Sequence, residues 1–399
     1  MMIEKKYLQS AICNAAERST QIRHDLHAHP ELSGQEKETA GRIMAELDAL
    51  GIPYRSNVYG HGIYALIEGQ DKNNAIALRT EMDALPIFEQ TNIPCISQIP
   101  GVMHACGHDV HMAAVLGAAR VLNEMKDKLP KSVVLLFEPM EETEGGADGL
   151  IGAGCLEDPH VTDIIASHIY PIYDSDKIIF IPGVMNAACC EFSVTVKGKS
   201  CHGAYPHLGF DPLVCACAMV TSLQSIITRR IHPAESALIT VGKFNSGTAI
   251  NVIPDTTTFA GTIRVLEMKN RPFIKDEIRR ICEGTAAAYG CDCEITFNDG
   301  YPTLENNPEL FAILSEDFKE RFGEEHVVIA PNPTLGADSF ACFCHAARAF
   351  LIYIGSKIPG SEPGSLHAAN LYVDEHCITT AIEAEVYGAL KLMGVEVEK

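Results

Sequence analysis

The segment from His104 to His111 carries the residue types of a metal site. Within eight residues it holds one thiol, three imidazoles and one carboxylate. Cys106 and His108 form the sharpest pair, because a thiolate and a neutral imidazole both bind zinc-like ions and the glycine between them permits a tight turn. Structural zinc sites usually space their cysteines as C-x2-C, so this C-x-H pair requires further ligands from elsewhere in the chain.

Two neighbouring carboxylates follow a predicted buried strand at 133–137. Pro139 would interrupt the ladder of that strand, and Glu141 and Glu142 come directly after it. Ligands bind at the carboxyl ends of strands in open α/β sheets, so one carboxylate could hold a metal while the other moves a proton. The alternative is an acidic turn that faces solvent.

Two histidines occupy comparable positions. His168 follows an apolar run at 163–167, and His367 lies beyond a predicted strand at 350–354. A lone histidine at a strand end is more often a hydrogen-bonded structural residue than a ligand. These two histidines become candidate metal ligands only in combination with the residues described above.

Cys106, His108, Glu142, His168 and His367 together make five candidate ligands. This number exceeds what one tetrahedral ion uses, and it suits two ions that share a bridging thiolate. Two such ions can acidify a water molecule and polarise a carbonyl group. The set therefore predicts hydrolysis of an amide bond.

Hydrophobic periodicity predicts an α/β arrangement around these residues. Amphipathic helices alternate with short apolar strands, which favours a mixed, largely parallel sheet flanked by helices. The predicted helices cover 7–26, 36–50 and 110–125, and the predicted strands cover 62–67, 75–78, 133–137 and 163–167.

The pattern changes after Gly183. Strand, helix, strand, strand, helix and strand follow in the order typical of a ferredoxin-like α+β sandwich. The α/β pattern then resumes, so we expect an insertion: residues 1–184 and 300–399 form one domain, and 185–299 form the inserted one. The predicted elements after Gly183 cover 191–197, 212–229, 237–244, 256–265, 275–288, 291–297, 309–321, 338–344, 350–354 and 375–391.

Composition narrows the possible partners. The 399 residues include 31 Lys plus Arg and 52 Asp plus Glu, a formal net charge of −21, which disfavours nucleic acid and anionic membranes. No signal-peptide pattern or long apolar run is evident, so we expect a cytoplasmic protein. Its 15 cysteines are then reduced thiols, most of which pack in the core.

Several specific motifs extend along almost the whole chain. They are LHAHPELS at 26–33, LRTEMDALP at 78–86, MHACGHDVH at 103–111, the pair Glu141-Glu142, GKSCHGA at 198–204, NVIP at 251–254 and GTIR at 261–264. This set resembles the dinuclear metallo-amidohydrolases of the aminoacylase and carboxypeptidase type, in the branch of hippurate hydrolase and the indole-acetyl-amino-acid hydrolases. The resemblance implies a zinc-peptidase-like catalytic domain with an inserted lid that also mediates homodimerisation.

The resemblance also implies roles for individual residues. Cys106 would bridge two divalent ions, zinc or manganese with cobalt or nickel possible, and Glu141 would be the general base. On the lid, His202 would stabilise the developing oxyanion, and Asn251 and Arg264 would hold the substrate carboxylate. The remaining metal ligands would be His108, Glu142, His168 and His367.

Other residues near the motifs are expected to support the ligands. Asp83 would orient ligands, and His111, three residues after His108, is a candidate partner behind the metal shell. The histidines that end the first predicted helix before Pro30, His24, His27 and His29, are expected to be structural or solvated.

Three positions depart from the family pattern. Glu81 stands where Asp is usual, Glu138 where Gln is usual, and 336–340 reads GADSF in place of GSEDF. None of these departures removes a candidate ligand, but they leave the substrate preference open.

The sequence thus predicts an enzyme that cleaves N-acyl amino acids, hippurate-like or N-acetylated, into a carboxylic acid and a free amino acid. An N-acetyl-diaminopimelate deacetylase or a dipeptidase is the alternative within hydrolases. A metal-dependent protein that binds acyl amino acids without cleaving them is a third possibility. Glu141 argues against it, because a binding protein has no need of a free carboxylate beside its ligands.

Overall fold

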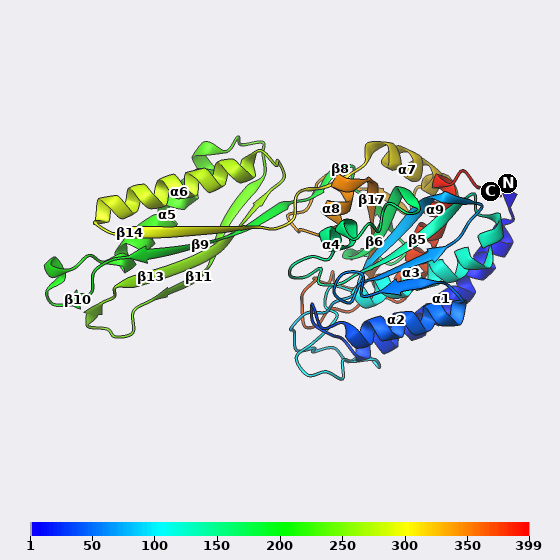
Figure 1. The fold of residues 1–399 in the computed structure, drawn as a ribbon, viewed down its shortest axis with the longest axis horizontal. Coiled ribbons are helices and arrows are strands. Elements are labelled where there is room, and N and C mark those ends of the chain that lie inside the picture. The colour runs from blue at the N-terminus through cyan, green and yellow to red at the C-terminus, as the bar shows by residue number, and fades with distance from the viewer. Residues whose placement is uncertain (1, 399) are drawn as a thin grey trace. The chain divides into compact units, whose positions relative to one another are not determined.

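The computed structural model describes residues 2–398, and the chain divides into two units that each have a hydrophobic core. The larger unit takes in the chain up to Gly183, the segment Glu305–Asn332 and the chain from Cys342 onward. The smaller unit comprises Val184–Leu304 and Pro333–Ala341 (Figure 1).

The segment Pro333–Ala341 groups with the smaller unit, whereas the sequence placed it in the larger domain. Thr334 N donates to Met185 O and Ala187 N donates to Gly336 O, both at 2.8 Å. These bonds tie the segment to the start of the smaller unit, and no periodic pattern in the sequence signals such a pairing.

The larger unit is built on an eight-stranded sheet. The four central strands are parallel, and antiparallel pairs occur towards both edges. This arrangement confirms the predicted mixed, largely parallel sheet. In sheet order the strands are β16 (Val327–Ile329), β7 (Ile178–Phe180), β17 (Arg348–Lys357), β6 (His160–Asp174), β4 (Asp71–Glu81), β5 (Lys131–Glu138), β3 (Ile63–Ile67) and β2 (Tyr54–Ser56).

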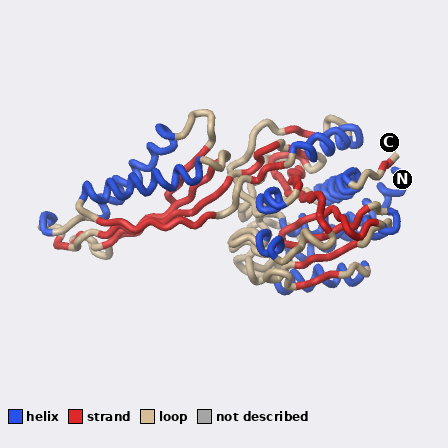
Figure 2. Tube along the Cα trace, turned by 45° about the horizontal axis from the view of Figure 1, so that its top comes forward, coloured by secondary structure: helices blue, strands red, loops and turns tan. Residues whose placement is uncertain are grey.

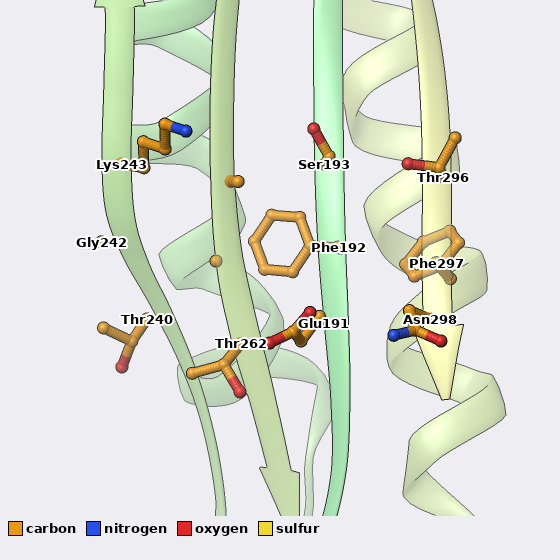
Figure 3. A pocket seen from close by; sticks show the side chains of 12 residues that line it. Glu191, Phe192, Ser193, Thr240, Gly242, Lys243, Thr262, Thr296, Phe297 and Asn298 are labelled. Atoms are coloured by element: carbon orange, nitrogen blue, oxygen red, sulfur yellow. The ribbon is translucent and has the colours of Figure 1, made fainter. Parts of the chain in front are cut away.

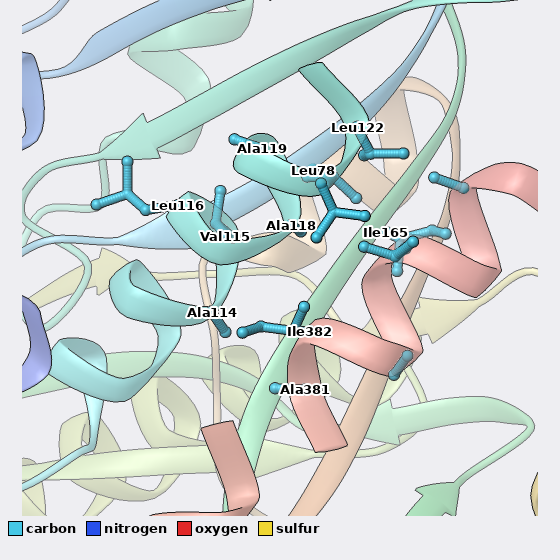
Figure 4. Packing of buried hydrophobic residues seen from close by; sticks show 14 of the residues in the cluster. Leu78, Ala114, Val115, Leu116, Ala118, Ala119, Leu122, Ile165, Ala381 and Ile382 are labelled. Carbon is cyan, nitrogen blue, oxygen red and sulfur yellow. The ribbon is translucent and has the colours of Figure 1, made fainter. Parts of the chain in front are cut away.

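Helix α3 (His108–Glu124) is buried along nearly its whole length, because its own sequence carries apolar residues on every face. It packs against α1 (Lys5–Ala28), α9 (His376–Leu392) and the sheet, as Figure 4 shows for its contacts with Ile165 and Ile382. A Cβ at Gly117 would lie 2.5 Å from both Ile382 Cδ1 and Ser19 Oγ, so only glycine permits this close approach of three helices.

The other elements of the chain are shorter or lie at the periphery. The helices are α2 (Lys37–Leu50), α4 (Ala147–Gly152), α7 (Pro308–Phe322), α8 (Phe340–Ala346) and the 3₁₀ turns η1 (Lys126–Lys128) and η2 (Pro206–Leu208). The two-stranded pairs are β1 (Met2–Ile3) with β18 (Glu396–Val397), β8 (Gly183–Asn186) with β15 (Leu304–Asn306), and β10 (Cys201–His202) with β12 (Val252–Ile253).

The smaller unit is an antiparallel sheet with two helices on one face (Figure 2). Its strand and helix order is the one predicted, and its sheet order β11-β13-β9-β14 is that of a ferredoxin-like sandwich. Asp211 caps the first helix by accepting hydrogen bonds from Leu213 N and Val214 N. In chain order the elements are β9 (Ala188–Lys197), α5 (Pro212–Arg230), β11 (Ala237–Ser246), β13 (Thr256–Val265), α6 (Asn270–Tyr289) and β14 (Asp292–Asp299).

Helix α5 is long and apolar enough to cross a membrane by length and composition alone, the one such helix in the part of the chain that the structure describes. In the structure it buries Cys215, Met219, Leu223 and Ile226 in the core of the smaller unit. Its hydropathy therefore reflects, at least in part, packing against the sheet.

The position of His168 differs from the prediction, which ended its strand at Ser167. Strand β6 continues to Asp174, because β17 pairs with it beyond the apolar run, and His168 is the register partner of Tyr353. His168 therefore lies inside a central strand, where pairing with β17 restrains its backbone, whereas the pairing of β6 with β4 ends at Ala166.

Candidate metal centre

The turn that carries Cys106 and His108 depends on Gly107. This glycine has φ 88°, in the left-handed region, and α3 begins directly after it. A Cβ at Gly107 would lie 2.3 Å from Ile169 Cδ1. Glycine is thus required for both its backbone conformation and its lack of a side chain.

Cys106 lies at the centre of a group of side chains from distant parts of the chain. Its Sγ lies 3.5 Å from His168 Nε2 on β6 and 3.3 Å from His367 Nε2. The loop that carries His367 is held by a hydrogen bond from His367 N to Ala105 O at 2.8 Å. A sulfur with an imidazole on two sides is placed as a bridging ligand would be.

The two predicted carboxylates follow β5 in a tight turn. Glu142 Oε1 lies 3.3 Å from His367 Nε2 and 3.9 Å from His108 Nε2. Burial alone would raise the pKa of Glu142, but the contacts with His367 and His108 lower it below its usual value. Glu141 is buried, and its ligand atom lies within 4.8 Å of those of His108 and Glu142.

Hydrogen bonds fix the orientation of the candidate ligands. His108 Nδ1 donates to Asp83 O at 2.8 Å, and His168 Nδ1 donates to Ile169 O at 2.8 Å. Each imidazole therefore keeps Nε2 as the atom that can bind a metal. Asp83 Oδ2 also accepts from Glu142 N at 2.9 Å, so Asp83 supports a histidine through its backbone oxygen and a glutamate through its carboxylate.

His111 is close to the ligands but is not available to a metal. Its Nε2 accepts a hydrogen bond from Ile169 N at 2.9 Å, and its Nδ1 contacts Glu81 Oε2 at 2.9 Å. Burial, with the neighbouring His168, lowers the pKa of His111 to about 3, so the ring is neutral. Both nitrogens are used, which places His111 behind the ligands.

The ligand atoms are better satisfied by a divalent cation than by hydrogen bonds among themselves. Among the residues described, His108 Nε2 and Glu142 Oε1 are buried without a hydrogen-bond partner, which is costly unless a further group satisfies them. Burial also raises the pKa of the Cys106 thiol well above its usual value, so a thiolate here requires a cation. Imidazole, thiolate and carboxylate together suit first-row divalent ions.

The ligand atoms form overlapping groups rather than one tetrahedron. Cys106 belongs to one group with His108 and His168 and to another with Glu142 and His367. In each group the ligand atoms lie within 4.8 Å of one another. Two ions that share the Cys106 sulfur would use both groups.

Sequence reasoning missed Arg79, which is fully buried. The predicted strand ended at Leu78 because charged residues follow, but β4 continues to Glu81. Arg79 Nε donates to Glu138 Oε2 at 2.7 Å and Nη1 contacts Glu81 Oε1, so one guanidinium offsets part of the charge of two carboxylates inside the sheet. The presence of three charged residues at the ends of two apolar strands was the sequence signal that could have indicated this buried group.

His27 has a structural role, which was one of the two roles expected for the first motif. It is buried, with Nδ1 2.9 Å from Asp109 Oδ2 and Nε2 3.2 Å from Glu89 Oε1. Burial would lower the pKa of His27, but Asp109 and Glu89 raise it to about 9. His27 thus joins α1 to the first turn of α3, next to His108.

The predicted substrate-binding residues lie on the smaller unit, at two separate places. Gly203 N, beside His202, donates to Asn251 O at 2.8 Å, so His202 and Asn251 are neighbours. Arg264 is the register partner of Cys189, near the opposite end of β9 from Lys197.

The length of β13 separates the two places. Gly198 N donates to Asp255 O, so the turn that leads to His202 leaves the sheet at the Thr256 end of β13. At roughly 3.3 Å per residue, Arg264 lies about 25 Å along the strand from that end. The smaller unit of one chain does not bring His202 and Arg264 together.

A hollow of about 470 Å³ lies on the sheet of the smaller unit. Glycines and small side chains at 242, 260 and 261 create it, and Thr240, Thr262 and Thr296 line it (Figure 3). It includes none of His202, Asn251 and Arg264. The hollow therefore gives no support to a binding role for those residues.

The fold and the site define a two-domain metallohydrolase, with candidate ligands on the mixed sheet and an inserted α+β unit. The model of Peptidase family M20/M25/M40 matches residues 77–389, most of the chain. The chain belongs to this family, and it is an enzyme of the metal-dependent amidohydrolase kind. The predicted family and enzyme class are confirmed.

Named relatives cover nearly the same length. The chain is 35% identical to an N-acetyldiaminopimelate deacetylase of Geobacillus thermodenitrificans, over 90% of this chain and 94% of that protein. It is 34% identical to hippurate hydrolase of Campylobacter jejuni, over 83% of this chain and 86% of that protein. The structure of the YXEP protein of Bacillus subtilis, a dinuclear metal-binding peptidase of the M20 family, matches with a TM-score of 0.82 and 30% identity, over 96% and 99% of the two chains.

Proposed function

We propose that this enzyme hydrolyses the amide bond of N-acyl amino acids to release a carboxylic acid and a free amino acid. The convergence of Cys106, His108, Glu142, His168 and His367 around one buried sulfur carries the proposal. The similarity to hippurate hydrolase supports this substrate class.

Glu141 is the general base of the proposed reaction. Two divalent ions, when bound, would polarise the amide carbonyl and acidify a water molecule. Glu141 is buried beside His108 and Glu142, within reach of a water between the ligands. It would take a proton from that water and pass it to the leaving amine.

Arg264 and Asn251 bind the substrate carboxylate in this proposal. The guanidinium of Arg264 is half-buried, and its Nη1 donates to Ile263 O at 3.2 Å. A planar guanidinium holds a carboxylate through two parallel hydrogen bonds, which suits it to this task.

His202 and Asn251 act on the site of a partner chain. An N-acyl amino acid spans about 7 Å, the length of two residues, so it cannot contact both ends of the smaller unit of one chain. A second copy of the chain would supply the missing group and let His202 stabilise the oxyanion.

The surface around His202 and Asn251 supports a homodimer through the smaller unit. Large apolar side chains close to these two residues in the chain are exposed to solvent, and exposed apolar side chains that gather together are typical of an interface. They are Tyr205, Leu208, Phe210, Ile250 and Val252.

Mixing two inactive variants tests the cross-chain arrangement. His202→Ala and Glu141→Gln chains should regain about a quarter of wild-type activity, because half of the random dimers would carry one intact site. No recovery, with chain exchange confirmed by mass, would assign His202 to the site of its own chain.

A substrate panel tests the reaction itself. We expect release of the amino acid from N-benzoyl or N-acetyl amino acids. The similarity to a diaminopimelate deacetylase makes N-acetyl-diaminopimelate the second candidate, and dipeptides complete the panel. No turnover on any member with metal bound would instead favour a binding protein.

Zinc or manganese is the proposed native metal, with cobalt or nickel as further possibilities. We also propose a cytoplasmic location, because all fifteen cysteines are free, as expected of a reducing compartment. Elemental analysis of the purified enzyme tests the metal, and fractionation of the source cell tests the compartment.

A further inference from the structure

A buried group of three charged side chains lies within the sheet of the larger unit. Arg79, Glu81 and Glu138 each have 0% exposure. Glu81 and Glu138 are register partners on the parallel strands β4 and β5, and the single guanidinium of Arg79 contacts both carboxylates. With both carboxylates ionised, the formal charge of the group is +1 − 2 = −1.

Hydrogen bonds connect this group to a candidate ligand. His111 Nε2 accepts from Ile169 N at 2.9 Å, and since a backbone N–H can only donate, the proton of neutral His111 is on Nδ1. His111 Nδ1 therefore donates to Glu81 Oε2 at 2.9 Å. On the other side, Ile169 O accepts from His168 Nδ1 at 2.8 Å, which leaves His168 Nε2 facing Cys106.

Packing reinforces the connection. The ring centroids of His111 and His168 are 4.4 Å apart, and those of His111 and His108 are 5.6 Å apart. A change in how Glu81 holds His111 would therefore move the ring that supports two candidate ligands.

We propose that Glu81 and Glu138, held in place by Arg79, are positioning residues that tighten the binding of divalent metal. Their net negative charge is fully buried, where the low dielectric lets it attract the cations strongly. The hydrogen bond that Glu81 accepts also fixes the tautomer of His111, and such outer partners usually contribute about 10- to 100-fold in metal affinity. The proposal rests on the metal centre of the proposed function but not on its substrate.

The zinc dissociation constant of Glu138→Gln tests the proposal. This change keeps the shape of the side chain and its hydrogen bond to Arg79 but removes one negative charge. We expect zinc affinity to fall at least about tenfold at pH 7. Glu138→Asp, which keeps the charge, should recover most of the loss.

Glu385→Gln is the matched control. Glu385 is also buried, and it accepts from Ser167 Oγ at 2.6 Å beside His168. Burial raises the pKa of Glu385 to about 8, so at pH 7 it is mostly neutral and the amide leaves the charge unchanged. Its zinc affinity should stay within a factor of about two of wild type, well below the roughly tenfold loss expected of an outer partner.

Zinc binding is measured by competition with a chelator on the full chain, and urea unfolding of the metal-free forms checks that each variant folds. If Glu138→Gln does not fold, Glu81→Gln carries the same charge change and replaces it. Unchanged zinc affinity in the folded variant, or an equal loss in Glu385→Gln, would overturn the proposal. Because activity is not the readout, failure on every substrate would contradict only the proposed function.

Discussion

The two units hold their candidate functional residues in opposite ways. In the larger unit the side chains are mostly buried, come from distant segments and lie within 4.8 Å of one another in overlapping groups. In the smaller unit His202 and Asn251 are exposed, and Arg264 lies near the other end of the sheet. One unit thus gathers its candidate residues in one place, whereas the other presents separated groups that, in the proposed function, a second chain completes. The predictions below test this difference.

Replacing the general base should have the largest effect. Glu141→Gln keeps the shape of the side chain but cannot accept a proton, so kcat should fall by about 10²- to 10⁴-fold. Metal content should stay near that of wild type, because Glu142 and not Glu141 is the proposed ligand. Steady-state kinetics with elemental analysis checks both results, and retained turnover would remove Glu141 from the mechanism.

Arg264→Ala tests the smaller unit. We expect kcat/KM to fall about 10- to 100-fold for substrates with a free carboxylate, because a charged hydrogen bond is lost. The loss should shrink for the corresponding amides, which lack that charge. An equal loss on acids and amides would show that Arg264 does not bind the carboxylate.

Two glycine substitutions separate the effect of backbone strain on stability from the effect of the Cys106–His108 turn on metal binding. Gly107 and Gly101 both have positive φ, 88° and 81°, but a Cβ meets Ile169 only at Gly107. Each Ala variant should lose about 1–3 kcal/mol of stability from strain. Gly107→Ala should in addition bind zinc more weakly. Urea unfolding and zinc titration check the pair, and equal zinc affinity would mean that the turn tolerates a side chain.

The last prediction concerns the pH dependence of stability. The pKa of His27 is about 9 in the folded chain against 6.5 when unfolded, so its charge stabilises the fold below pH 6.5 and this contribution is lost as pH rises through 9. His27→Asn should therefore destabilise by on the order of 1–3 kcal/mol at pH 6 and by less at pH 9.5. His29→Asn, at a half-exposed position, is the control. A pH-independent loss in His27→Asn would argue against a charged His27.

The sequence predicted most of the elements, because both units follow regular hydrophobic periods. It ended β4 at Leu78 and the strand of His168 at Ser167, since hydrophobicity gives no sign that a strand continues through charged or polar residues that pair inside the fold. The candidate ligands were found from residue type and spacing, and from the family resemblance. Arg79 was missed because its role depends on pairing between β4 and β5, which a single sequence does not contain.

The central claim is that the larger unit binds two metal ions that share the Cys106 sulfur. Titration of the metal-free enzyme with cobalt(II), followed by absorbance, tests it most directly. The claim predicts saturation at two equivalents per chain, with a thiolate-to-cobalt charge-transfer band that is absent in Cys106→Ser. Saturation at one equivalent, or a band that persists in Cys106→Ser and so arises from another cysteine, would contradict it.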